Sequence, residues 1–235
     1  MITIEIAGLP IGIDNKYEHL SIQARDYLSD KEPIFTVSVS EDEIDAERKI
    51  TGTDYPSGYY ESVMAYRKIA DKLPEYDAFL FHGCVIELDG KAYIFTAKSG
   101  VGKTTHMRIW ISQFGREISV INGDKPTVRI IDGVPYASGT PWRGKEGYGK
   151  NVVREVAGIV FVNRGEVNIA SKITAPEALN AFMSQIYLPR KNQPNLIKTM
   201  RLADSFIKAV RLVRLECNME PEAAHVCRRA LLEND

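Results

Sequence analysis

Cysteine is scarce in this sequence, with only three residues among 235. Cys84, Cys217 and Cys227 form no pair at a spacing typical of a zinc site, and an odd number does not indicate a disulfide framework. We therefore expect three buried free thiols. The sequence also lacks internal repeats and low-complexity tracts, so we expect an ordinary globular protein.

Long apolar runs and an excess of charge of one sign are also missing. No run approaches the ~20 apolar residues that span a bilayer. The 30 basic and 31 acidic side chains give a net charge of -1, so no electrostatic bias favours nucleic acid or an anionic membrane. Residues 1–7 alternate in polarity and include Glu5, unlike a secretory signal. We expect a cytoplasmic protein.

What the sequence does have is a glycine-rich segment with a lysine and a threonine at its end, AKSGVGKT, at residues 97–104. This is close to the phosphate-binding P-loop, although Ala97 replaces the usual first glycine. Glycines let successive N–H groups turn toward phosphate oxygens, the lysine contacts the β and γ phosphates, and the threonine hydroxyl binds Mg²⁺. The predicted phosphate-binding residues are Ser99, Gly100, Val101, Gly102, Lys103, Thr104 and Thr105.

The flanking sequence favours this interpretation over a glycine-rich turn that only connects a strand to a helix. Apolar runs at residues 79–88 and 92–97 are joined by Asp89-Gly90, a dipeptide typical of a hairpin turn. After the loop, apolar residues recur with helical spacing and Gly115 follows as a helix cap. These helical positions are Met107, Trp110, Ile111 and Phe114. The predicted order is strand, loop, helix.

A second candidate site residue, Asp124, follows an apolar strand that contains Ile118, Val120 and Ile121. P-loop enzymes complete their magnesium site with an acidic residue on a neighbouring strand, because Mg²⁺ prefers hard oxygen ligands. Thr104 and Asp124 are thus the predicted metal ligands. The alternative is an ordinary turn aspartate beside glycine. The distance from Lys103 to Asp124 accommodates one helix and one strand, which predicts a single crossover.

The segment HGCVIELDGKAYIFTAKSGVGKTTHMRIW, followed by VINGDKPTVRI, resembles the catalytic core of HPr kinase/phosphorylase and its relatives, the small serine and peptide kinases and the ATP-dependent phosphoenolpyruvate carboxykinases. The resemblance covers roughly residues 79–160. It implies a hairpin histidine at His82 and a metal-binding aspartate at Asp124. The preceding aspartate, which the resemblance implies is the acid/base of the bifunctional enzyme, falls on Gly123. A glycine cannot accept the proton of an attacking hydroxyl.

His82 is a candidate for part of that missing role, since an imidazole titrates near neutrality. The alternative is a histidine hydrogen-bonded within the hairpin. His19, His106 and His225 stand in no motif, and we expect surface or helix positions for them.

Residues 138–151 are rich in glycine and cations and predict a long loop. Arg143 and Lys145 are candidates to contact the transferred phosphate or an acidic substrate, with the loop acting as a lid that excludes water. A solvated surface loop is the alternative, in which Trp142 only anchors the segment. Arg190 and Lys191 lie between prolines in another exposed connection, where they either recruit substrate or are merely solvated.

Alternating strands and helices predict an α/β sandwich around a mixed sheet. Further strands are expected at residues 2–6, 11–13, 35–39, 152–163 and 210–217, and further helices at 17–28, 61–73, 175–186, 196–209 and 222–232. We predict an N-terminal α/β segment at 1–76, which selects substrate or covers the sheet, and a P-loop kinase-like nucleotide-binding domain at 77–235.

The combined prediction is an ATP-dependent kinase, or one using another nucleoside triphosphate, that transfers the γ-phosphoryl group to a hydroxyl on a protein, peptide or small molecule. Catalytic candidates are Lys103, Asp124, His82, Arg143 and Lys145; the predicted cofactors are ATP and Mg²⁺. Two alternatives stay open: a phosphoenolpyruvate carboxykinase-like enzyme, and a nucleotide-sensing module with little transfer activity. The resemblance also implies assembly into homo-oligomers.

Overall fold

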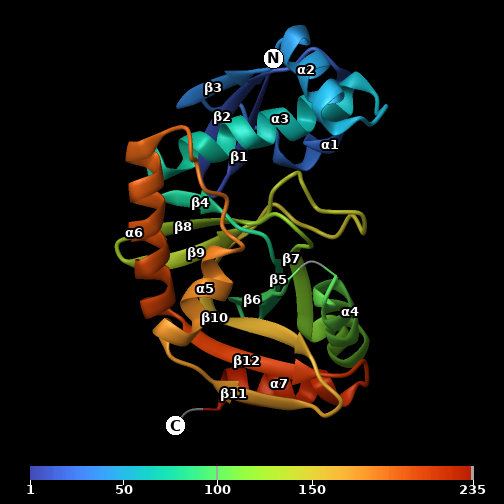
Figure 1. The fold of residues 1–235 in the computed structure, drawn as a ribbon, viewed down its shortest axis with the longest axis vertical. Coiled ribbons are helices and arrows are strands. Elements are labelled where there is room, and N and C mark those ends of the chain that lie inside the picture. Colours follow the sequence, from blue (N-terminus) through green and yellow to red (C-terminus); the bar gives the residue numbers. More distant parts are fainter. Residues whose placement is uncertain (99, 234–235) are drawn as a thin grey trace.

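The computed structural model describes residues 1–98 and 100–233 as a mixed α/β structure (Figure 1). The chain is elongated, with a small N-terminal sheet and its helices at one end and a larger sheet at the other. Among the described helices, none combines the length and apolar character required to cross a membrane.

The N-terminal part is a small sheet covered by helices. In the described residues the sheet has the order β1-β2-β3, with β1 and β2 antiparallel and β2 and β3 parallel. The strands are β1 (Ile2–Ile6), β2 (Leu9–Asp14) and β3 (Phe35–Ser38), and the helices are α1 (Glu18–Gln23), η1 (Arg25–Tyr27), α2 (Glu41–Thr51), α3 (Ser57–Lys72) and η2 (Leu73–Tyr76). Alternate strand residues, such as Ile4 and Ile11, are fully buried against these helices.

The larger sheet contains nine of the strands that the structure describes, and its central path runs β4-β8-β9-β10-β6-β5-β7. Its strands are β4 (Ala78–Leu80), β5 (Cys84–Leu88), β6 (Lys91–Thr96), β7 (Ile118–Asn122), β8 (Thr127–Ile131), β9 (Val134–Ser138), β10 (Val153–Arg164), β11 (Ile169–Lys172) and β12 (Arg211–Cys217). The long strand β10 pairs with β9 near its start and lies between β6 and β12 further on.

Helices pack on both faces of this sheet. They are α4 (Lys103–Phe114), η3 (Gly115–Glu117), α5 (Ala175–Met183), α6 (Gln193–Ala209) and α7 (Glu222–Leu232). In β6, Ile94 belongs to the core with α5 and α6, while its neighbour Phe95 belongs to the core with α4 and α7. This alternation buries both faces, and the predicted α/β sandwich is confirmed.

The strand directions bring several chain segments to one edge of the sheet. Strands β6, β10 and β12 are parallel, and β7 is parallel to β6 because β5 is antiparallel to both. The carboxyl ends of all four strands therefore lie at the same edge, with β5 between β6 and β7. Ligands of α/β proteins commonly bind outside such an edge.

Three segments differ from the sequence-based expectations. The apolar run 79–88 is not one strand: it breaks at residues 81–83, and β4 and β5 pair with different neighbours. The charged segment 41–51 is a helix, which begins at a capping box formed by Ser40 and Glu43. Finally, Thr127–Ile131 and Val134–Ser138 form a hairpin that the sequence interpretation did not anticipate. The proposed division at residues 76 and 77 stays a prediction.

Candidate functional site

The glycine-rich segment lies between β6 and α4, in the predicted order of strand, loop and helix. Gly100 has φ of 79° and Gly102, which caps α4, has φ of 128°. A Cβ at either position would meet open space, so glycine is needed here for the backbone conformation rather than for room. The amide of Val101 donates to the carbonyl of Lys98 at 3.2 Å. Ser99, another predicted phosphate ligand, lies outside the described residues.

Arg164 holds the outside of this loop in place. Its Nε donates to the carbonyl of Val101 at 3.0 Å, and its Nη2 donates to the carbonyl of Gly100 at 2.6 Å. The carbonyls of Gly100 and Val101 are therefore directed at Arg164. The sequence interpretation did not single out Arg164, because a lone arginine at the end of β10 has no motif around it.

Lys103 is the first residue of α4 and its side chain is only 11% exposed. Its Nζ lies 3.7 Å from Asp124 Oδ1. Burial lowers the pKa of Lys103, since a desolvated ammonium is disfavoured, while Cys84 and Asp124 act in the opposite direction. The ammonium therefore lacks full compensation within the protein, which suits it to a polyanionic ligand.

Asp124 is surrounded by the nitrogen groups of basic side chains. His82 Nε2 lies 3.2 Å from its Oδ1, and Lys125 Nζ lies 3.5 Å from its Oδ2. Burial acts to raise the pKa of Asp124, but the His82 hydrogen bond and the charges of Lys125, His82 and Lys103 outweigh it and bring the pKa to about 2. The carboxylate is thus ionised at any physiological pH.

His82 is fixed by its backbone in the connection between β4 and β5. Its amide donates to the carbonyl of Gln185, and its carbonyl accepts from Thr96 Oγ1 at 3.1 Å. The side chain is consequently directed at Asp124 rather than buried in a hairpin. His82 is hydrogen-bonded, but its partner is the candidate metal ligand Asp124 and not a group within a hairpin. Its role as a base stays a prediction.

Asn122, the last residue of β7, organises the turn that carries Asp124. Its side chain is fully buried, and its Oδ1 accepts from the amides of Asp124 at 2.8 Å and Lys125 at 2.7 Å. Its Nδ2 donates to the carbonyl and the Oγ1 of Thr140, both at 3.2 Å. One side chain therefore sets the direction of Asp124 and ties the turn to the next loop.

Gly123 has no room for a side chain. A Cβ at this position would lie 2.8 Å from the carbonyl oxygen of Arg143, which belongs to the backbone and cannot easily move. The Gly123 amide donates to the carbonyl of Tyr148 at 3.0 Å, and its carbonyl accepts from the thiol of Cys84. The loop that follows β9 thus occupies the space that an aspartate would need.

That loop is anchored at both ends and exposed in the middle. Residues 139–142 are buried, and Trp142 packs in the N-terminal core, where its Nε1 donates to Ser62 Oγ at 3.0 Å. Lys150 donates from its amide to the carbonyl of Ile121. The stretch 144–148 between these anchors is exposed. The Trp142 anchor is confirmed, whereas the lid role stays a prediction.

Arg143 does not contact Asp124. Its Nη2 lies 2.6 Å from Asp26 Oδ2, and its guanidinium is 5.3 Å from the ring centre of Tyr27. Lys145 has no ion pair among the residues that the structure describes. The neighbouring Glu146 pairs with Arg108 of α4. The structure therefore brings together Lys103, Thr104, Asp124 and His82, and holds Arg143 on the N-terminal part.

Three adjoining cavities lie along this edge of the sheet. The loop cavity, of about 350 Å³, is lined by His82, Lys98, Gly100, Gly102, Lys103, Thr104, Thr105 and Asp124. The large cavity, of about 930 Å³, shares Thr104 and Asp124 with it and extends to α1, α3 and the loop after β9. The strand-end cavity, of about 400 Å³, shares Gly102 and Thr105 with it and reaches the ends of β10 and β12. The loop cavity thus adjoins the other two at different residues.

The remaining predicted residues lie elsewhere. Arg190 and Lys191 are exposed in the turn before α6 and line none of these three cavities. His106 is on α4, as expected, but is buried and accepts a hydrogen bond from Trp110 Nε1. All three cysteines are free and buried. Among the described residues, no group of three His, Cys, Asp or Glu side chains could hold a metal by itself.

Comparison with known proteins yields little at the level of sequence. The sequence matches no protein family and no curated protein. The solved structure of the Hpr(Ser) kinase/phosphatase from Coxiella burnetii is similar with a TM-score of 0.38 and 9% sequence identity, covering 64% of this chain and 94% of that one. This is a distant likeness in fold alone.

Replacing Asn122 by alanine should destabilise the protein by about 1–3 kcal/mol, because the change leaves a buried carbonyl and two partly buried amides without partners. Urea unfolding followed by circular dichroism measures this. Asn163→Ala is the matched control, since that exposed asparagine has one long hydrogen bond, to the carbonyl of Phe161 at 3.4 Å. Equal stability of the two variants would contradict the role given to Asn122.

Asp124 should make the free energy of unfolding depend on pH in the acid range. Its folded pKa lies below its unfolded value, so the ionised carboxylate contributes stability above about pH 4, and this contribution is lost as pH falls toward 2. At neutral pH the contribution is on the order of 2 kcal/mol. The difference in unfolding free energy between the native protein and Asp124→Asn should therefore shrink between pH 5 and pH 2. A difference that is constant with pH would contradict the ion cluster.

Proposed function

We propose that this protein is a phosphotransferase that uses ATP or another nucleoside triphosphate to phosphorylate a hydroxyl group. The observation that carries the proposal is the loop cavity. One small space is lined by the glycine-rich loop and the start of α4. The largely buried ammonium of Lys103, the hydroxyl of Thr104 and the ionised carboxylate of Asp124 line the same space. Amides at a helix start and an ammonium together favour a polyphosphate.

In this proposal the loop amides and Lys103 bind the β and γ phosphates. The γ phosphate lies toward Thr104 and Asp124, where the loop cavity opens into the large cavity. Lys103 suits this role because α4 and the core around it fix its position and its ammonium is poorly solvated. The charge that spreads over the transferred group is stabilised by groups already in place.

The residues present fit a magnesium ion. Thr104 and Asp124 offer hard oxygen ligands in the same cavity, and Asp124 is held ionised. Two protein oxygens suffice where phosphate oxygens and water complete the coordination. A bound magnesium ion would neutralise charge on the β and γ phosphates. Lys125 and His82 hold Asp124 in its present direction.

The transfer forms a bond between the acceptor oxygen and the γ phosphorus and breaks the bond to the bridging oxygen, which leaves with the nucleoside diphosphate. The hydroxyl proton passes to the imidazole of His82, because Gly123 offers no side chain and the ionised Asp124, which is hydrogen-bonded to His82, is too weak a base. Phosphoryl transfer depends more on positioning and charge than on a strong base. A chain without the usual aspartate can therefore still carry out transfer.

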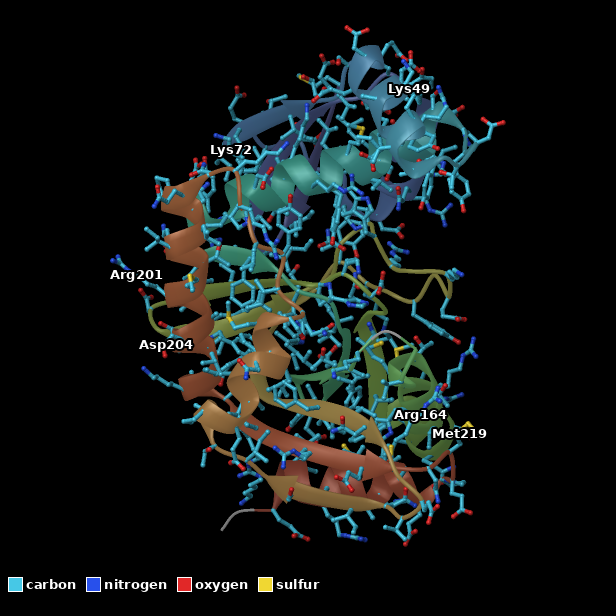
Figure 2. The ribbon with its side chains drawn as sticks, viewed as in Figure 1. Lys49, Lys72, Arg164, Arg201, Asp204 and Met219 are labelled. Carbon is cyan, nitrogen blue, oxygen red and sulfur yellow. The ribbon has the colours of Figure 1, made fainter. Side chains whose placement is uncertain are left out.

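The strand-end cavity takes the nucleoside in this proposal. It adjoins the loop cavity at Gly102 and Thr105, away from Asp124. Its walls include the apolar side chains of Ile109, Val162 and Met219. Figure 2 shows Arg164 and Met219 beside one another next to α4. An aromatic base fits such an apolar wall beside polar edges.

Lys103→Ala should reduce phosphate transfer on the order of a hundredfold or more, because it removes a charge that the transition state needs. Labelled Mg-ATP is supplied with pools of metabolites and peptides, and the labelled products are separated and counted. Lys49→Ala is the control, an exposed lysine on α2 at the far end of the molecule (Figure 2). Equal labelling by both variants would contradict transfer at this site.

Met219→Ala combined with Ile109→Ala should weaken ATP binding by about five- to tenfold, since apolar area is lost from the nucleoside side. Binding of inorganic tripolyphosphate should not change. Calorimetry measures both ligands, with the exposed Met200→Ala on α6 as control. A parallel loss for both ligands would place the effect in the phosphate site instead.

A nucleotide-sensing module is the second candidate. The observation that favours it is the closed space at Gly123, which leaves no dedicated base. Binding of ATP at Lys103 without transfer to any acceptor would support the sensor over the kinase.

A further inference from the structure

The large cavity has two walls of opposite chemical character. One wall comes from α1 and α3 and carries Ile22, Tyr59, Val63 and Tyr66. Trp142, from the loop after β9, also lines the cavity. Ile22 and Tyr59 are exposed although both are large and apolar. Apolar side chains that line a cavity rather than the core are typical of a ligand site.

The other wall is charged, and each of its carboxylates, Asp26, Asp124 and Glu146, is already paired with a cation. Lys125 and Lys145 line it from the turn after β7 and from the loop after β9. Lys125 already faces Asp124 at 3.5 Å, and Arg143 is paired with Asp26. Lys145, in contrast, has no carboxylate within 4.0 Å in the described part of the chain. One cation is thus left for a negative group of a ligand.

The end of the cavity between these walls is formed by Thr104, Gly123 and Asp124. Thr104 and Asp124 also line the loop cavity, so a group at this end faces the proposed γ phosphate. The volume of about 930 Å³ lies in the range of small-molecule sites, which commonly form between parts of a fold.

We propose that the large cavity is the acceptor site and that the acceptor is a small hydroxy acid with an apolar or aromatic group. The inference rests on the proposed function. The hydroxyl lies toward Thr104 and Asp124, the acid group toward Lys145, and the apolar group against α1 and α3. The hydroxyl oxygen bonds to the γ phosphorus, the nucleoside diphosphate leaves, and the proton passes to the imidazole of His82.

This assignment also gives the N-terminal part a function. Ile22, Tyr59 and Tyr66 belong to helices of that part, whereas Lys145 belongs to the loop. Gln23 links the two, because it donates to the carbonyl of Pro141 and accepts from Ser62. Substrate choice therefore depends on how the helices and the loop are held together, with the phosphate site kept separate.

The test compares three matched probes without nucleotide: 3-phenyllactate has all three groups, 2-phenylethanol lacks the acid, and lactate lacks the ring. Binding is measured by calorimetry and by the fluorescence of Trp142, with Trp142→Phe identifying the signal. We expect 3-phenyllactate to bind at least tenfold more tightly than either partial probe. In Lys145→Ala, 3-phenyllactate should bind no more tightly than 2-phenylethanol. In the double variant Tyr59→Ala with Ile22→Ala, the difference in affinity between 3-phenyllactate and lactate should become smaller. Lys49→Ala should change neither.

Equal binding of the three probes, or preferences that survive these substitutions, would overturn the inference, as would binding of hydroxyl-bearing peptides alone. ATP binding to the same proteins is measured separately. If ATP fails to bind while the probe preferences hold, the kinase proposal fails and the acid site stands. If ATP binds and Lys103 matters but the preferences are missing, the acceptor inference fails and the kinase proposal stands.

Discussion

The candidate site depends on the buried side chain of Asn122. Its oxygen accepts from two successive amides and so forms the turn that directs Asp124 toward α4. Its amide group reaches Thr140 and so holds the start of the loop after β9. The two hydrogen bonds to Thr140 are buried and those from the turn amides are partly buried, and a buried polar group without a partner is costly. The turn and the loop therefore have little freedom to separate.

This constraint explains the glycine that follows. With the loop held close by Thr140, the carbonyls of Arg143 and Tyr148 cover Gly123, and a larger residue would have to displace backbone. The resemblance to kinase/phosphorylases implies that their acid/base aspartate falls at this glycine. The difference is not confined to one residue, because the neighbouring loop fills the space where the aspartate side chain would lie.

The sequence predicted those parts of the site that are local in the chain. The strand, loop and helix around Lys103 follow from glycine spacing and apolar periodicity, and Asp124 follows one crossover later. Arg164, Asp26 and Tyr59 were not predicted, because they meet the site from elements far apart in sequence and have no motif. The helix at 41–51 could have been found, since Ser40 and Glu43 have the spacing of a capping box. The break at residues 81–83 could also have been found, since His82 and Gly83 interrupt the apolar run there, but the change of partner strand could not.

The arrangement of charge also explains why one carboxylate can serve such a site. Asp124 neutralises part of the charge of Lys103 and Lys125 and so allows these two cations to lie close together. Without it, mutual repulsion would spread them apart and the cavity would lose its shape. Because Lys103 is poorly solvated, its attraction to phosphate is stronger than that of an exposed lysine. The aspartate therefore keeps the cations assembled, and in the proposed function it would also offer an oxygen ligand of the kind that magnesium prefers.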